Sequence, residues 1–164
     1  MARCARELKA PRHSLVGSAP EAFAAGLRAL VALDASCAPS DVSLAVLGVP
    51  PDAFVVPWSE ASIRGYALDR VLNQAQLARL ETRAARLWPP GPFALGAAAA
   101  RTAEAMIRSA RGPLNALAVL DGDFGARNQV AAVPVFLSPE GIARVYIPDL
   151  NPRERVRVES ALQG

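Results

Sequence analysis

The last third of the sequence contains three strand-like segments joined by connections of only a few residues. They are NALAVLDG (115–122), QVAAVPVFLS (129–138) and ARVYIP (143–148), all rich in aliphatic residues. The residues PEG at 139–141 predict a tight turn between the last two. Short connections favour an antiparallel three-strand unit, and this unit constrains the fold more strongly than any other feature of the chain.

Predicted helices precede this unit. In PEAFAAGLRALVALDAS (20–36), apolar residues recur at helical spacing and place Phe23, Leu27, Leu30 and Val31 on one face. Two further helices are expected, over 94–110 and over 67–87, the latter with Val71, Ala75, Ala78 and Ala85 facing inward.

A last helix is predicted after the strands, because its start carries three helix signals. Asn151 is a favoured N-cap, Pro152 suits the first helical position, and Glu154 can complete a capping box. Helices combined with an antiparallel strand unit predict an α+β fold. The length of 164 residues fits a single domain with a hydrophobic core.

Residues 47–55 read LGVPPDAFV, in which two adjacent prolines separate two apolar runs. Each proline fixes φ and removes a backbone donor, so the pair predicts a turn. The flanking runs, 41–48 and 53–58, are predicted strands, and 14–17 (SLVG) is a shorter one. Residues 2–10 are expected to form the end of a helix.

The composition excludes several protein classes. With 52% hydrophobic and 20% charged residues, the chain is not expected to be disordered. The longest uncharged stretch, 87–100, is too short and too interrupted by prolines to span a bilayer. The first residues lack the apolar core of a secretory signal. We therefore expect a cytoplasmic protein without a membrane partner.

The sequence offers little for metal binding or for nucleic-acid binding. Cys4 and Cys37 are isolated thiols, and His13 is the only histidine, so neither a metal site nor a disulfide framework is expected. The net charge is +3, with arginines scattered among acids, which is not typical of a nucleic-acid surface. The arginine stripe at 79–86 could meet an anionic partner or could be an ordinary solvated helix face.

The segment from Leu120 to Leu162 resembles the end of the NAD-dependent lactate and malate dehydrogenases. That family typically shows an L-x-G-x-Y-G turn, a G-V-P-V strand, a glycine turn, a second strand, the letters LPL and a closing helix. The matching residues here are Leu120, Gly122, Phe124 and Gly125, then AVPV at 132–135, Gly141, Ile147, Pro148 and Leu150.

With that anchor the resemblance extends over nearly the whole chain and implies the family's C-terminal, substrate-binding α+β domain. We therefore expect one such domain over 1–164, with 1–17 as the remnant of a junction to a missing nucleotide-binding domain. No G-x-G-x-x-G occurs in the 164 residues, so the chain lacks the phosphate cradle of a Rossmann domain. NAD is expected only if a separate nucleotide-binding half exists.

The resemblance implies catalytic positions that this sequence does not fill. The family's histidine in G-x-H-G-D falls on Pro50 and the following glycine on Pro51, and only Asp52 of that motif remains. The aspartate that orients the histidine falls on Phe23, and the arginine that grips the substrate carboxylate falls on Gly26. No catalytic residue is therefore expected.

Three hypotheses follow. The first is a catalytically degenerate, non-enzymatic binding or scaffold domain that forms homo-oligomers or binds a partner. The second is the C-terminal part of a split or truncated malate/lactate dehydrogenase-like oxidoreductase that needs a separate Rossmann-type chain. The third is a small-ligand sensor with a remnant pocket near Arg28 and Asp52. The chain alone is not expected to be an enzyme; if active, it would be an NAD-dependent 2-hydroxy acid dehydrogenase.

Overall fold

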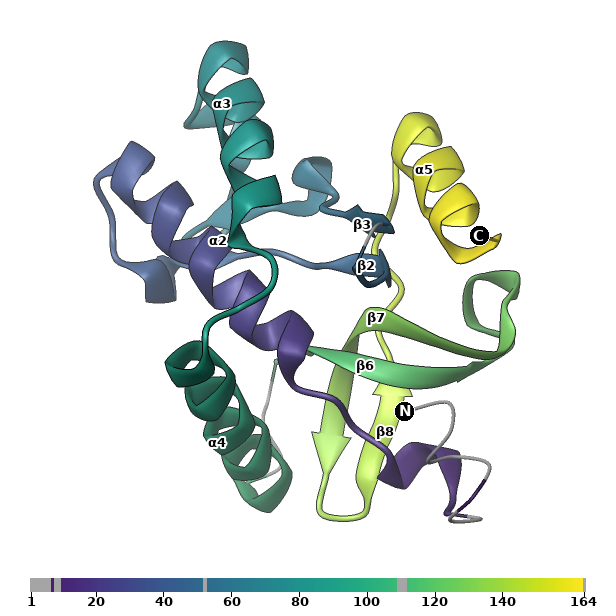
Figure 1. The fold of residues 1–164 in the computed structure, drawn as a ribbon. Helices are drawn as coiled ribbons and strands as arrows, with labels where there is room; N and C mark the ends of the chain where they lie inside the picture. The colour runs from purple at the N-terminus through teal and green to yellow at the C-terminus, as the bar shows by residue number, and fades with distance from the viewer. Residues whose placement is uncertain (1–6, 8–9, 52, 109–111, 164) are drawn as a thin grey trace.

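The antiparallel strand unit predicted from the sequence is the centre of the structure (Figure 1). The computed structural model describes residues 7, 10–51, 53–108 and 112–163. Its larger sheet has five strands, with the order β3-β2-β7-β6 and with β8 paired to β7; every pairing is antiparallel. The strands are β2 (Leu47–Val49), β3 (Ala53–Val55), β6 (Leu114–Asp121), β7 (Arg127–Ser138) and β8 (Gly141–Val145).

A second, smaller sheet lies beside the β2–β3 hairpin. It contains β1 (Val42–Ser43), β4 (Ser62–Ile63) and β5 (Tyr66–Ala67) in the order β1-β4-β5. Arg64, at the tip of the β4–β5 turn, forms an ion pair with Asp41 at 2.8 Å. The hydrogen bond from Arg64 lowers the pKa of the Asp41 carboxyl, because it stabilises the charged form.

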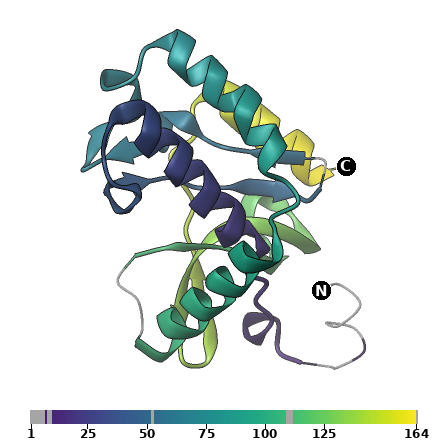
Figure 2. The same cartoon turned by 60° about the vertical axis from the view of Figure 1, so that its left-hand side comes forward.

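In the part of the chain that the structure describes, four α-helices with defined bounds lie around the sheets. They are α2 (Ala19–Ala35), α3 (Gln74–Ala84), α4 (Pro92–Arg108) and α5 (Pro152–Gln163). Helix α2 runs through the middle of the molecule and contacts α3, α4 and β6. Figures 1 and 2 show α2 and α3 on one side of the β2–β3 hairpin and α5 on the other. The mixed α+β fold predicted from the sequence is confirmed.

The β2–β3 hairpin separates two hydrophobic cores. Val46 and Val56 point into the first core, together with Leu27 of α2 and Leu80 of α3. Leu47 and Val55 point into the second, where they pack with side chains of β6, β7 and α5. Because successive side chains of a strand point to opposite faces, neighbouring residues of one hairpin serve both cores.

The predicted helix over 67–87 is shorter than expected and faces a different way. It consists of a 3₁₀ turn (Leu68–Arg70), α3, and a second 3₁₀ turn (Ala85–Leu87). Of the positions expected to face inward, Val71, Ala75, Ala78 and Ala85 are all exposed. Within α3 the buried positions are Leu80 and Ala84, and before it Leu68 and Leu72 are buried. Asn73 caps the start of α3, where its side chain accepts a hydrogen bond from the Gln76 amide at 2.9 Å.

Two predicted strands also differ from the structure. The run 41–48 is divided between β1 and β2, which belong to different sheets. SLVG forms only a single bridge, between Gly17 and Leu117. Most of the helix expected over 2–10 lies outside the described residues, as does Cys4. Cys37 is a free thiol that packs against the first core.

The predicted cap of the last helix is confirmed. The Asn151 side chain accepts a hydrogen bond from the Glu154 amide at 2.9 Å, and Glu154 accepts one from the Asn151 amide at 3.3 Å. Glu154 is 8% exposed and also accepts hydrogen bonds from the amide and the hydroxyl of Ser59. This carboxylate therefore joins the start of α5 to the loop after β3.

We expect Glu154→Ala to lower the free energy of unfolding by about 1–3 kcal/mol, because it removes half of the capping box and the charged acceptor of both the Ser59 amide and the Ser59 hydroxyl. Urea denaturation would measure the change. Glu159→Ala, at an exposed position of the same helix, is the matched control and should change stability by less than about 0.5 kcal/mol. Equal effects of the two substitutions would contradict this role of Glu154.

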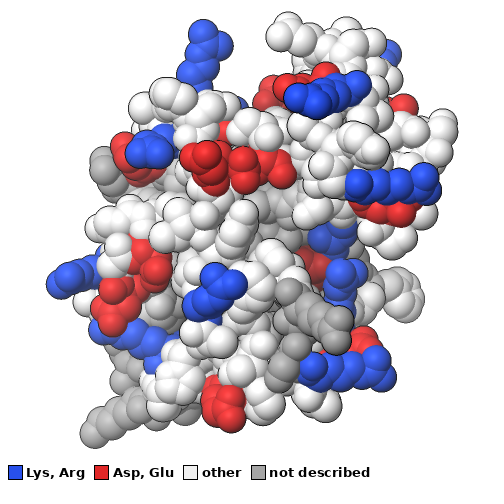
Figure 3. All heavy atoms as spheres, turned by 180° about the vertical axis from the view of Figure 1, so that it is seen from behind, with Lys and Arg blue, Asp and Glu red and all other residues white. Residues whose placement is uncertain are grey.

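The structure also bears on the membrane-spanning and nucleic-acid-binding classes that were considered from the composition. Among the described residues, no helix is both long and apolar enough to cross a membrane. On the face of the molecule seen in Figure 3, acidic and basic side chains are interspersed. One of the stripe arginines, Arg83, forms an ion pair with Asp34 at 3.2 Å.

Candidate functional site

Pro50 and Pro51 form the turn between β2 and β3, as the sequence predicts. The hairpin pairs Leu47 with Val55, Gly48 with Phe54, and Val49 with Ala53. The two prolines therefore keep the chain reversal at this point and provide no group that can take up or release a proton.

Phe23 and Gly26 of α2 and Pro51 of the proline turn all lie near the segment Leu87–Trp88. The Phe23 ring stacks on Phe54 at 4.9 Å between centroids and meets Trp88 edge-on at 6.1 Å. Phe23 and Pro51 line the same cavity, which has a volume of about 320 Å³. A position in α2 and a position in the β2–β3 turn are thus brought together, whereas Pro50 lines a different cavity from Phe23.

Gly26, where the resemblance led us to expect a position that grips substrate, faces the same segment. A Cβ atom at Gly26 would lie 3.2 Å from the Leu87 side chain. The space beside this helix position is therefore filled by a leucine. Together with Phe23 it gives this end of α2 an apolar surface.

A second cavity, of about 400 Å³, lies on the other side of the proline turn. It is lined by Pro50, Pro51 and Trp88, and by Leu117 and Val130 from the sheet. Because both cavities share Pro51 and Trp88, they form neighbouring parts of one apolar region around the turn.

Arg28, one of the two weak candidates for substrate binding, lies elsewhere and already has a partner. Its guanidinium forms a short ion pair with Glu21, whose side chain is 2% exposed. Glu21 also accepts a hydrogen bond from the Asn115 amide at 3.1 Å and lies 3.4 Å from Nε of Arg101. Asp52, the other candidate, lies outside the described residues.

The cavity at Arg28 has a volume of about 680 Å³ and shares no lining residue with the cavities at Pro51. The sequence-based hypothesis put Arg28 and Asp52 at one remnant pocket, whereas the structure places Arg28 in a cavity separate from those at the proline turn. Arg28 has a structural role there, because it neutralises a buried carboxylate.

Sequence reasoning missed the polar network around Glu21 and the role of Trp88. Glu21 and Arg28 are seven residues apart in a predicted helix and so share one face, which was a usable signal. Trp88 lies in the proline-rich segment WPPGP, which has no periodicity from which its contacts could be predicted.

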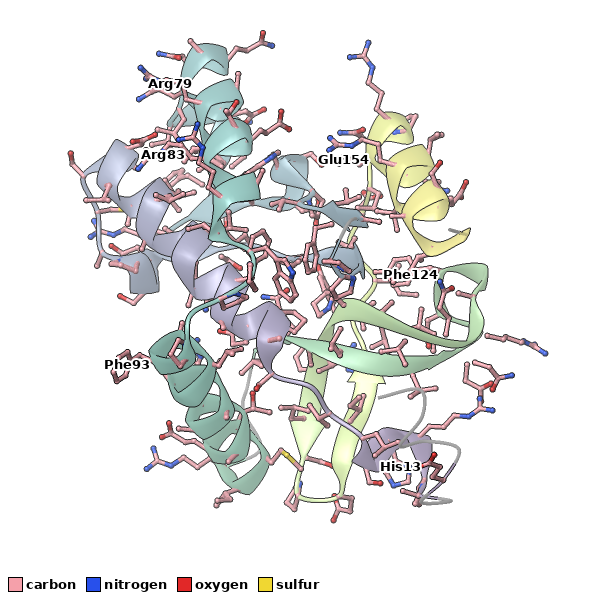
Figure 4. The ribbon with its side chains drawn as sticks, in the orientation of Figure 1. His13, Arg79, Arg83, Phe93, Phe124 and Glu154 are labelled. Atoms are coloured by element: carbon pink, nitrogen blue, oxygen red, sulfur yellow. The ribbon has the colours of Figure 1, made fainter. Side chains whose placement is uncertain are left out.

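His13 lies far from the proline turn. It belongs to the 3₁₀ turn Arg12–Ser14, at the lower right of Figure 4, and its carbonyl approaches Gly141 at the β7–β8 turn. Within the described ranges, no three His, Cys, Asp or Glu side chains are grouped in a way that could hold a metal ion.

Comparisons with known proteins agree with the geometry. No protein-family model matches the chain. The malate dehydrogenase 1 of Anaeromyxobacter dehalogenans is 29% identical over 163 residues, which is 94% of this chain and 52% of that protein. The L-lactate dehydrogenase of Mesoplasma florum is 26% identical over 155 residues, covering 87% of this chain and 49% of its own length.

Solved structures also match nearly all of this chain with only about half of a dehydrogenase. The malate dehydrogenase of Aeropyrum pernix superposes with a TM-score of 0.89 at 18% identity, over 99% of this chain and 57% of its own. The chain thus spans about half the length of the dehydrogenases that it matches. Over nearly its whole length it is similar to lactate and malate dehydrogenases, and the matched half is consistent with the carboxyl-terminal domain of those proteins.

Proposed function

We propose that this chain is the carboxyl-terminal, substrate-side half of a malate/lactate dehydrogenase-like protein, and that it works together with a Rossmann-type nucleotide-binding unit. That unit belongs either to a longer polypeptide or to a separate chain. The observation that carries the proposal is the similarity along 94% of this chain to only 52% of a malate dehydrogenase.

The residues of this chain do not fit NAD by themselves. The 164 residues contain no G-x-G-x-x-G, and so no loop of this type that could hold a pyrophosphate against a helix N-terminus. The cofactor would therefore be held by the partner unit, and this half would form the wall against which a substrate lies.

A second candidate is a non-enzymatic binding or scaffold domain, and the apolar residues around the proline turn favour it. The family's proton-transferring histidine corresponds to Pro50, and the aspartate that orients it to Phe23, which is 4% exposed among other aromatic rings. Loss of a general base typically costs about 10²–10⁴ in rate. We therefore propose that the paired protein keeps the architecture of a dehydrogenase but not its ordinary chemistry.

Exposed apolar side chains on α4 are consistent with association. Phe93 is 93% exposed and Ile107 is 78% exposed, and Figure 4 shows Phe93 pointing away from the rest of the molecule. Large apolar side chains at such exposure favour contact with another protein surface. Self-association or a Rossmann-type partner would cover them.

The experiment combines sedimentation with an activity assay. The chain should be measured alone and together with the Rossmann-type unit encoded in frame with it or beside it. We expect a stable complex, and NADH oxidation with oxaloacetate or pyruvate at least about 10²-fold slower than that of the Anaeromyxobacter dehalogenans malate dehydrogenase. A complex with full dehydrogenase activity would contradict the degenerate site. Failure to find or bind any Rossmann-type unit would contradict the pairing and favour an independent binding domain.

A further inference from the structure

The 320 Å³ cavity beside the proline turn has an aromatic wall built from three separate elements. Phe23 comes from α2, Phe54 from β3, and Trp88 from the segment before α4. The three rings contact one another, with centroid distances of 4.9 Å, 6.1 Å and 4.7 Å. Trp58 lines the same cavity, so both tryptophans of the chain face it. Rings in this arrangement offer faces and edges to a further ring.

The rim of this cavity carries one cation and one anion. Arg157 of α5 and Glu81 of α3 both line it, and Nη1 of Arg157 lies 3.8 Å from Oε1 of Glu81. The two side chains are 57% and 50% exposed. A pair that is this long and this exposed is weak, because water screens both charges. Arg157 is therefore available to a carboxylate that reaches the rim from inside the cavity.

The size and chemistry of the cavity define a ligand class. Its volume lies at the lower end of the range for small-molecule sites, so one ring or two fused rings fit better than a larger compound. A planar guanidinium holds a carboxylate through two parallel hydrogen bonds, which also orients the bound molecule. Glu81 disfavours a second negative group at the rim.

We propose that this cavity binds a small planar aromatic monocarboxylate, with its ring among Phe23, Phe54 and Trp88 and its carboxylate on Arg157. This site uses residues of this chain alone, and it does not rest on pairing with a nucleotide-binding unit. The larger cavity at Arg28 does not offer the same chemistry, because Arg28 is occupied by the buried Glu21.

The two tryptophans provide a direct measurement. We expect trans-cinnamate to quench the tryptophan fluorescence of the whole chain in a saturable way. Cinnamamide, which has the same ring and no charge, should bind about tenfold more weakly. Acetate, which has the charge and no ring, should have no effect. Absence of saturable quenching by cinnamate up to about 10 mM would overturn the proposal.

Arg157→Ala tests the role of the rim. We expect it to weaken cinnamate binding about tenfold and to leave cinnamamide binding unchanged, since only the charged ligand uses the guanidinium. Arg155→Ala, at an exposed position of the same helix, is the matched control and should change neither affinity. Equal cinnamate affinity in the two variants would overturn the assignment of Arg157. Both substitutions are on the surface, so the comparison does not depend on a change in the core.

Discussion

Replacing Glu21 with alanine is expected to lower the free energy of unfolding by about 3–5 kcal/mol, the largest effect expected for any charged residue described above. Glu21 accepts hydrogen bonds from the Asn115 amide at 3.1 Å and from Arg28, whose side chain is 11% exposed. Without the carboxylate, Arg28 would keep its charge in a place that water hardly reaches. Chemical denaturation followed by circular dichroism would measure the loss.

Two further variants separate the charge of Glu21 from its hydrogen bonds. Glu21→Gln keeps an acceptor for Asn115 but not the negative charge, so its loss should lie between that of alanine and zero. Glu104→Ala removes a carboxylate that is 57% exposed and pairs with Arg108 one helical turn away, and should cost less than about 0.5 kcal/mol. A loss below about 1 kcal/mol for Glu21→Ala would show that the network does not support the fold.

The network explains why Glu21 matters beyond its own helix. Asn115 of β6 also accepts a hydrogen bond from the Val46 amide at 2.8 Å and donates one to the Leu44 carbonyl at 3.3 Å. The carboxylate thus joins the start of α2 to β6, and through Asn115 to the residues before β2. Its loss would loosen three elements together.

Gly48→Ala is expected to have the second large effect, a loss of about 3–5 kcal/mol in the free energy of unfolding or a failure to fold. Gly48 has φ of 112°, and a Cβ atom there would lie 1.9 Å from the Ala53 carbonyl oxygen on the paired strand. The substitution therefore combines backbone strain with a collision that only separation of β2 and β3 can relieve.

Gly96→Ala is the matched control for this substitution. Gly96 lies inside α4, and a Cβ atom there meets nothing within 4 Å. Alanine in a helix restricts the unfolded chain, so this variant should be stabilised by about 0.4–1 kcal/mol. Thermal unfolding of the two variants should therefore shift in opposite directions. A Gly48→Ala protein as stable as the parent would mean that the hairpin is packed differently from the arrangement described here.

Helical spacing and capping residues, which act over a few positions, were sufficient to predict α2 and the start of α5. The apolar face of α2 and the capping box of α5 were both read correctly, because helical spacing and the residues Asn151 and Glu154 determine them within a few positions. The antiparallel unit was also predicted, since short connections leave few other arrangements.

The predictions were wrong where several local patterns compete, or where a strand pairs with another strand that is distant in the sequence. In 67–87, alanines at helical spacing suggested the wrong face, although Asn73 and Gln76 form a capping box that marks the true start. The division of 41–48 between two sheets depends on β4 and β7, and neither is close in sequence.

The candidate site was predicted in part. Phe23 lines one cavity with Pro51, while Pro50, the position that the resemblance pairs with Phe23, lines the neighbouring one. The resemblance did not predict Trp88, which completes the aromatic wall from a segment without periodicity. It also did not predict that the Arg28 guanidinium is held by Glu21, since burial of that carboxylate depends on β6.

The alternation of the β2–β3 hairpin between two cores has a consequence for how this chain can change during evolution. Inserting or deleting one residue within either strand would send every following side chain of that strand into the opposite core. Homologous sequences should therefore keep the same number of residues between positions 46 and 56, even where the amino acids themselves differ. By contrast, the loop at 122–126 lies between β6 and β7, so an extra residue at its exposed Gly122 would not shift the alternation of the hairpin strands, while Phe124 and Ala126 pack against the second core.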